Sequence, residues 1–257
     1  MKKILVIIIL ILCTTSSYAD ITTGLIGLWK FDENTSGTCS GASIVDSSGN
    51  GYTGTCGSSP TWVVGKIGAG AINLSPANAN VTFSGLTSTI SAPYSVACWM
   101  YLNSSVSGAN YSLWNTRTPS EHGTDLAINY PTVGLHGDIG SGSGWINTSA
   151  DISYTFSTST WYHIVATYSA TTYTYYVDGS SIGSGSIGGT GLLIDTTHTL
   201  VTGFSTGIGS LPGHVDDLRV YTRVLSPSDV TQLYNYTGQN NGYFLFKKAQ
   251  LRGLTVN

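Results

Sequence analysis

Apolar residues alternate with polar ones over short runs of this sequence, at the spacing that places every second side chain on one face of a β-strand. The runs are rich in Val, Ile, Thr, Tyr and Trp, and clusters of Gly, Ser, Asn and Pro separate them. Many short strands bounded by such turn residues are typical of antiparallel sandwiches and barrels. The pattern therefore predicts an all-β fold.

Three stretches show the strand pattern most clearly, and the two later ones are consecutive. We expect long strands over Tyr94–Leu102 and Trp161–Tyr168, and a third strand over Tyr173–Val177. Asp178 and Gly179 follow, where the two central residues of a type I′ hairpin turn need positive φ angles. The sequence therefore predicts a hairpin that returns the chain after Gly179.

A strand and one short helix are expected near the carboxyl end. The strand covers His214–Tyr221, where apolar and polar residues alternate less regularly. Ser226 is a suitable N-cap, Pro227 suits the first helical position, and Asp229 completes a capping-box pattern. The apolar residues within Val230–Tyr234 share one face, so the helix should pack against the sandwich.

The amino terminus predicts export. Lys2 and Lys3 precede the apolar run Ile4–Leu12, and Ser17–Ala19 offers small residues at a signal peptidase site. We expect a signal peptide over residues 1–19 and a secreted mature protein. The apolar run is much shorter than the roughly 20 residues of a spanning helix, so no membrane span is expected in the mature chain.

The rest of the chain is expected to form one domain over residues 20–237, followed by a tail over residues 238–257. The tail carries Tyr243–Phe246 and several basic residues, so it is either an edge strand or a docking segment. Charged residues make up only 9% of the chain, and the formal net charge is −3. No basic patch with interleaved aromatic residues occurs, which argues against nucleic-acid binding.

The cysteines indicate one disulfide. Cys39 and Cys56 flank a Gly/Ser-rich loop and could pair in an oxidising compartment, while Cys98 stands between apolar neighbours and is expected to be a buried free thiol. Cys-x-x-Cys pairs are absent from the sequence, which excludes zinc-ribbon and thioredoxin-like sites.

A series of motifs runs through the chain in a defined order. They are Gly27–Glu33, Asp46–Gly51, Gly65–Gly68, Ala71–Leu74, Tyr94–Met100, Trp161–Tyr168, Tyr176–Gly179, Val215–Tyr221 and Leu225–Val230. In order and spacing these motifs resemble laminin G-like jelly-roll domains of the concanavalin A-like lectin/glucanase superfamily. The resemblance covers residues 25–236 and implies a two-sheet antiparallel β-sandwich, a jelly roll that ends in a short helix. Because this fold carries lectins, adhesion modules, hydrolases and lyases, function must come from the site.

The resemblance also implies a structural calcium ion. In similar domains, calcium ties an oxygen-rich loop to an acidic residue of the final strand, and Ca²⁺ prefers carboxylate and carbonyl oxygens. The matching candidates here are Asp46 and Asn50 in the loop, with Asp216 or Asp217 in the strand. The alternative is a plain Asx turn that Asp46 itself stabilises.

The acidic residues argue against catalysis. Glycoside hydrolases need two carboxylates that flank one bond, and those on this fold carry them as alternating Asp and Glu residues along one strand. Glu33 and Glu121 lie in no such pattern, and the neighbouring acids Asp216 and Asp217 would point to opposite faces of a strand. We therefore predict a binding module and no enzyme; the alternative is a secreted carbohydrate-active enzyme, either a hydrolase or a lyase.

The stretch Asn110–Trp145 is the candidate ligand site. Glycan sites combine aromatic rings with amide, carboxylate or guanidinium groups, and here both kinds alternate with Gly-rich turns that also carry His136 and Asp138. The alternative is that the aromatic residues fill the core, and Trp114 in particular resembles a strand residue. The predicted partner is a glycan or another extracellular ligand. The residues chosen as candidates are Tyr111, Trp114, Arg117, Glu121, His122, Asp125 and Trp145.

Overall fold

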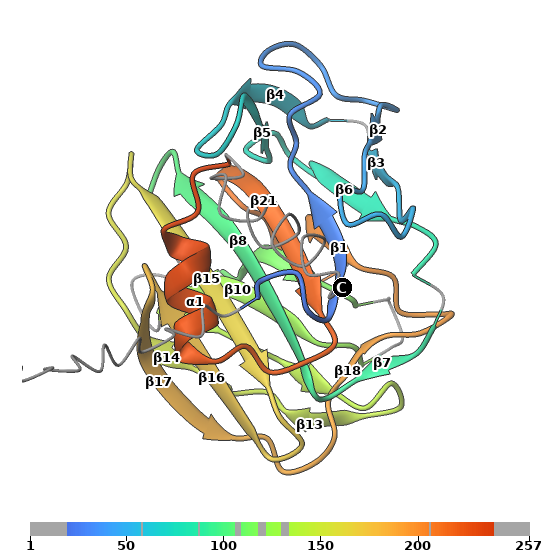
Figure 1. The fold of residues 1–257 in the computed structure, drawn as a ribbon, viewed down its shortest axis with the longest axis vertical. Coiled ribbons are helices and arrows are strands. Elements are labelled where there is room, and N and C mark those ends of the chain that lie inside the picture. Colours follow the sequence, from blue (N-terminus) through green and yellow to red (C-terminus); the bar gives the residue numbers. More distant parts are fainter. Residues whose placement is uncertain are drawn as a thin grey trace, which may run out of the picture.

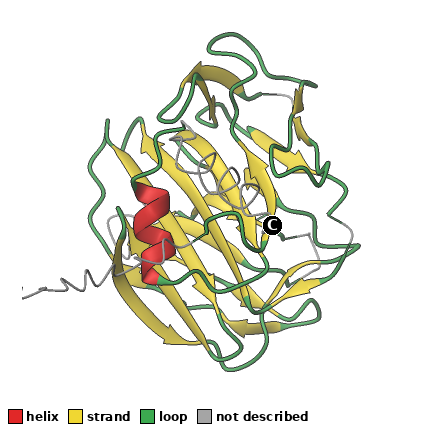
Figure 2. Cartoon of the chain, in the orientation of Figure 1, coloured by secondary structure: helices red, strands yellow, loops and turns green. Residues whose placement is uncertain are grey.

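Two sheets packed face to face make up most of the computed structural model (Figure 1), and one short helix lies outside them (Figure 2). The structure describes residues 20–57, 59–86, 88–105, 109–117, 122–129, 134–205 and 207–238. The predicted signal peptide, all but the first residue of the predicted tail, and the candidate residue Glu121 lie outside these ranges. Within them, no helix is long and apolar enough to cross a membrane.

The first sheet, sheet A, has the strand order β17-β16-β15-β8-β21-β5-β4, with β1 also paired to β21. Its longest strands, β8, β15 and β21, are central neighbours although they are far apart in the sequence. The strands are Leu25–Trp29 (β1), Thr61–Val64 (β4), Gly70–Asn73 (β5), Tyr94–Leu102 (β8), Trp161–Tyr168 (β15), Thr172–Val177 (β16), Ser180–Ser186 (β17) and Gly213–Tyr221 (β21).

The second sheet, sheet B, has the order β14-β11-β10-β9-β19-β6-β3-β2, with β20 beside β9. Two short pairs, β12 with β13 and β7 with β18, lie outside both sheets. The bounds are Ser43–Ile44 (β2), Gly54–Cys56 (β3), Asn80–Phe83 (β6), Ile90–Ser91 (β7), Tyr111–Asn115 (β9), Asp125–Asn129 (β10), Gly134–His136 (β11), Ile139–Gly140 (β12), Trp145–Asn147 (β13), Ile152–Ser153 (β14), Leu192–Ile194 (β18), Val201–Gly203 (β19) and Gly209–Ser210 (β20).

The all-β sandwich, the long strands and the hairpin are confirmed. β8 and β15 have the predicted bounds, and β16 and β21 each begin one residue earlier than expected. Between β16 and β17, Asp178 and Gly179 have φ angles of 49° and 82°, as a type I′ turn requires. The aromatic and β-branched residues of these strands thus form the sheet that their period-two pattern predicts.

The core lies between the sheets. Along β8, Val96 and Met100 face it, whereas Ala97 points to the outer face of sheet A. Trp29 and Phe83 join the sheets across it, with ring centroids 4.1 Å apart. Each large apolar side chain buried in this way stabilises the fold by roughly 1.5–3 kcal/mol.

Helix α1, Pro227–Tyr234, covers part of the outer face of sheet A (Figure 1). The Ser226 hydroxyl accepts a hydrogen bond from the Asp229 backbone N–H at 3.2 Å, and the Asp229 carboxylate accepts one from the Ser226 N–H at 2.7 Å. This is the predicted capping box. Val230 and Leu233 belong to an apolar cluster that includes Val165 of β15, so the helix is held by one buried face.

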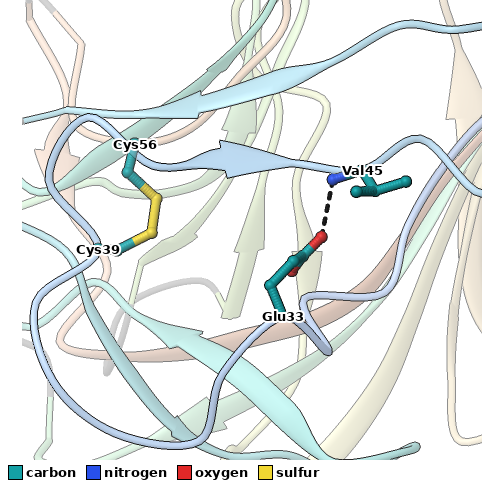
Figure 3. Close-up of a disulfide and its surroundings, with 4 residues drawn as sticks. All are labelled: Glu33, Cys39, Val45 and Cys56. Atoms are coloured by element: carbon teal, nitrogen blue, oxygen red, sulfur yellow. Dashed lines mark hydrogen bonds between the residues drawn. A yellow bond between two sulfur atoms is a disulfide. The ribbon is translucent and has the colours of Figure 1, made fainter.

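A disulfide joins Cys39 to Cys56 at the end of β3 (Figure 3), as predicted. Beside it, the Glu33 carboxylate accepts a hydrogen bond from the Val45 N–H at 2.7 Å, just after β2. Cys98 is a buried free thiol, which was also predicted. The disulfide therefore secures the far edge of sheet B, where the strands are short.

The double variant Cys39→Ser/Cys56→Ser is expected to lower the free energy of unfolding by about 3 kcal/mol, because the loop between the two residues regains conformational freedom in the unfolded chain. Urea unfolding followed by tryptophan fluorescence measures the change. Wild-type protein treated with reductant should lose the same amount, and an unchanged midpoint in both samples would contradict this role.

Candidate functional site

Charged and aromatic side chains gather where three strands of sheet B end on one side. Arg117 follows β9, Asp125 begins β10, Asp138 follows β11, and Trp145 begins β13. β9, β10 and β11 are antiparallel neighbours, so Arg117, Asp125 and Asp138 meet at one end of these strands. Trp145 of β13, outside sheet B, joins them through its contact with Arg117. We call this cluster the Arg117 site and define it as Arg117, Asp125, His136, Asp138, Trp145 and Asp151.

The Arg117 guanidinium group is held from three directions. Its Nη1 donates to Asp125 Oδ2 at 3.1 Å and to Asp138 Oδ2 at 3.3 Å. Its central carbon lies 4.8 Å from the centroid of the Trp145 ring, a cation–π contact. The His122 ring meets Trp145 edge-on at 4.9 Å. Only about a fifth of the Arg117 side chain is exposed, 20%, so the group is fixed and yet reaches solvent.

Backbone pairing places the two carboxylates. Asp125 lies opposite Asn115 of β9, and its N–H donates to the Asp138 carbonyl at 2.9 Å. The Asp138 N–H in turn donates to Asp125 Oδ1 at 3.1 Å. Burial, and then the charge of Asp138, raise the pKa of Asp125 to about 7 in spite of Arg117. Asp125 is wholly buried, and its carboxylate therefore positions Arg117 from the protein interior.

His136 lies between the carboxylate of Asp138, which is mostly buried, and that of Asp151, which is more exposed. Its Nε2 lies 3.4 Å from Asp138 Oδ1, and its Nδ1 lies 2.6 Å from Asp151 Oδ1. The contact with the Asp138 carboxylate is the main cause that raises the pKa of His136 to about 9, and the hydrogen bond to Asp151 adds to it. His136 is therefore an imidazolium at neutral pH, with a carboxylate on each side.

Three of the predicted ligand residues, Arg117, Asp125 and Trp145, belong to the Arg117 site, and a fourth, His122, contacts Trp145 beside it. His136 and Asp138 lie in the same stretch of sequence, outside the predicted ligand set. Asp151 was missed, because it lies beyond that stretch and reaches His136 only through the pairing of β11 with β14. No local sequence signal could have found it.

Trp114 and Tyr111 lie away from the Arg117 site, and the burial of Trp114 fits the alternative that this ring fills the core. Trp114 is 1% exposed and lies opposite Leu126 in the core, so no ligand can reach it. Tyr111 begins β9 opposite Ile128, at the other end of the strand from Arg117. At about 3.4 Å per residue, that separation is roughly 20 Å.

The loop expected to hold calcium is closed by its own hydrogen bonds. The Asp46 carboxylate accepts from the backbone N–H groups of Leu28, Ser48 and Tyr52 at 2.8–3.0 Å, and from the Ser48 hydroxyl at 2.8 Å. The Asn50 amide donates to the Ile26 carbonyl at 3.0 Å. This is the Asx-turn arrangement, in which protein donors occupy the carboxylate.

The acidic residues of β21 that were expected to bind calcium also accept hydrogen bonds from the protein. Asp217 accepts two hydrogen bonds from Arg219, at 2.8 and 3.1 Å. Asp216 Oδ2 accepts from the N–H groups of Lys66 and Ile67, and only Oδ1 is buried without a partner. No group of three or more acidic, His or Cys side chains among the described residues could hold a metal. These residues therefore do not fit a shared calcium ion, which stays a prediction.

Asp46→Ala is expected to lower the melting temperature equally with calcium and with a chelator, because the variant loses protein hydrogen bonds worth about 1 kcal/mol each. Differential scanning fluorimetry in the two buffers measures this. A loss of stability confined to the calcium buffer would instead support the ion.

The titration of His136 predicts how stability depends on pH. Its pKa is about 9 in the folded protein against 6.5 for the free side chain, so the stabilisation is complete below pH 6.5 and is lost as the pH rises through 9. We expect the wild type to lose on the order of 2 kcal/mol more than His136→Gln over this window. Urea unfolding at pH 6.5 and pH 9 measures the difference; equal losses would contradict the ion pairs.

Comparison with known proteins identifies a family. The sequence matches the model of the Laminin_G_3 family, described as the concanavalin A-like lectin/glucanases superfamily, over residues 75–231. No curated protein matches the chain.

Several solved structures share the fold. Domain 4 of AbnA, a GH43 extracellular arabinanase from Geobacillus stearothermophilus solved with arabinotriose, has a TM-score of 0.63 and 22% identity, with 82% of this chain and 98% of that domain covered. The receptor-binding domain of botulinum neurotoxin D has a TM-score of 0.63 and 18% identity, with 84% of this chain and 53% of that one covered. A serotype D ligand-binding domain with N-acetylneuraminic acid has a TM-score of 0.61 and 18% identity, with 83% and 51% covered. The chain thus spans about half of the neurotoxin domains, and identities this low show the fold alone.

Proposed function

The chain belongs to the concanavalin A-like lectin/glucanase superfamily, and on that premise we propose that it is a secreted, non-catalytic carbohydrate-binding module whose ligand contacts Arg117 and Trp145. The observation that carries the proposal is the contact between these two half-buried side chains, 4.8 Å from guanidinium carbon to ring centroid, where β9 of sheet B ends and β13 begins. A recognition module for adhesion to a glycan-bearing surface is a variant of the same function.

The chemistry of the two residues suits a sugar. A sugar ring has apolar C–H surfaces that pack on indole, and hydroxyl groups that accept hydrogen bonds from guanidinium. Because Asp125 and Asp138 already hold Arg117, little conformational entropy is lost when a ligand binds. Two of the similar structures were solved with arabinotriose or N-acetylneuraminic acid, which supports a carbohydrate as the ligand class.

The carboxylates of the Arg117 site favour binding over turnover. A glycosidase needs one carboxyl group to protonate the leaving oxygen and a second to attack or activate water. Asp125 is wholly buried and Asp138 is 8% exposed, and both are bound to Arg117. Neither carboxyl group is placed to contact a glycosidic bond, so we propose no catalytic role.

Secretion is part of the same proposal. Disulfides persist in oxidising compartments, and the Cys39–Cys56 bond supports such a destination. The pattern of Lys2, Lys3 and the apolar run Ile4–Leu12 supports export by a signal peptide.

Trp145→Ala and Arg117→Ala are expected to weaken glycan binding by on the order of tenfold or more, because each removes a contact worth about 1–2 kcal/mol. Trp161→Ala is the matched control, since Trp161 is also a half-buried strand residue but belongs to β15 of sheet A. A glycan array identifies the strongest ligand, and isothermal titration calorimetry with that ligand compares the three variants.

Equal weakening by all three variants would show that the Arg117 site is not the binding surface. Incubation of the wild type with the bound glycan tests catalysis. Release of reducing sugar that disappears in Asp138→Asn would replace the binding module with an enzyme.

A further inference from the structure

The hydrogen-bonding capacity of Arg117 is only partly used. Among the described residues, Arg117 donates its side-chain hydrogen bonds from Nη1 alone, and its Nε and Nη2 meet no acceptor there. These two nitrogens form the edge of the guanidinium group that can bind a pair of oxygens side by side. The fixed arginine therefore offers a bidentate donor edge beside an indole ring.

The charge of Arg117 is already balanced. Arg117 and His136 contribute two positive charges, and the carboxylates of Asp138 and Asp151 contribute two negative charges within direct contact. Asp125 adds a further carboxyl group, with a pKa of about 7. The net charge of the Arg117 site at neutral pH thus lies between zero and one negative charge, so it offers an anion no Coulombic attraction.

Carboxylate and hydroxyl oxygens of a sugar differ in how they could bind the Nε and Nη2 groups of Arg117. A carboxylate on a sugar can only accept hydrogen bonds, and it would come close to the negatively charged Asp138, whose Oδ2 lies 3.3 Å from Arg117 Nη1. A sugar hydroxyl accepts from Arg117 and still donates to a neighbouring carboxylate. Two hydroxyls on adjacent carbons satisfy the donor edge without adding charge.

We infer that the Arg117 site selects uncharged glycans with adjacent free hydroxyl groups and discriminates against glycans that carry a carboxylate at the contact. The inference rests on the proposed carbohydrate-binding function and narrows its ligand class. The carboxylates Asp138 and Asp151 act as the discriminating groups, because they cancel the positive charge that would otherwise attract an acidic sugar.

The test uses an array of matched pairs, in which each neutral glycan is printed beside its acidic counterpart: galactose oligomers with galacturonate oligomers, and lactose with sialyllactose. The wild type should bind a neutral member on the order of tenfold more tightly than its acidic counterpart. Acidic members that bind as tightly or more tightly would overturn the inference and leave the binding function intact. No binding to any glycan would overturn the proposed function, and the inference with it.

Two variants test whether the carboxylates of the Arg117 site cause the discrimination against acidic glycans. Asp138→Asn and Asp151→Asn each raise the net charge of the Arg117 site by one, to between zero and one positive charge, so the preference for the neutral member should shrink several-fold or reverse. The Asp151 side chain is 32% exposed, so its variant keeps the test valid if Asp138→Asn fails to fold. Glu33→Gln is the matched control, because it removes one negative charge beside β2, the edge strand of sheet B, four strands away from β9 in the sheet order. An unchanged ratio in Asp151→Asn, equal to that of Glu33→Gln, would overturn the inference.

Discussion

The two sheets must bury their apolar faces against each other. This burial fixes the register between β9 and β10, and the position of Arg117 depends on that register. Trp114 and Leu126 lie opposite each other with both side chains in the core. A slip of one residue would turn Trp114 to the outer face, so the register is strongly fixed. Given that register, the start of β10 at Asp125 and the residues that follow β9, including Arg117, lie at the same end of the two paired strands. The hydrophobic core thus determines which charged groups meet.

The contact between Arg117 and Asp125 is better explained by positioning than by stability. Removing a carboxylate from water is costly, and ion pairs in protein interiors often contribute little net stability compared with apolar residues of similar size. Asp125 is wholly buried, and its raised pKa reflects this cost. What the pair provides is a guanidinium group in a fixed position against Trp145. Such preorganisation lowers the entropic cost of binding, as expected for a recognition site built on strands.

Local patterns predicted most of the fold. The strands Tyr94–Leu102 and Trp161–Tyr168, the Asp178 turn and the Ser226 cap each depend on residues close in sequence, so period, turn chemistry and capping were sufficient. The Arg117 site was predicted only in part, because its residues are local but their partners depend on register. Asp151 required the pairing of β14 with β11.

Two other predictions show the limits of residue type as a guide. Trp114 was chosen because aromatic rings bind sugars, but the same ring fills a core, and only the register of β9 distinguishes the two roles. Asp46 was a calcium candidate because the loop is rich in oxygen atoms and resembles that of similar domains; in the structure, backbone N–H groups of this loop and of Leu28 donate to it. Whether a carboxylate binds a cation or accepts hydrogen bonds from N–H groups depends on the backbone geometry around it, which residue types alone do not predict.

The central claim is that ligand binding takes place at Trp145, and the indole N–H resonances test it directly. The chain has 6 tryptophans, and each gives one indole signal in a ¹H–¹⁵N spectrum. On titration with the strongest neutral glycan from the array, the Trp145 signal is expected to shift, whereas the buried Trp29 and Trp114 signals stay in place. A shift of the Trp161 signal on sheet A, with the Trp145 signal unmoved, would contradict the claim.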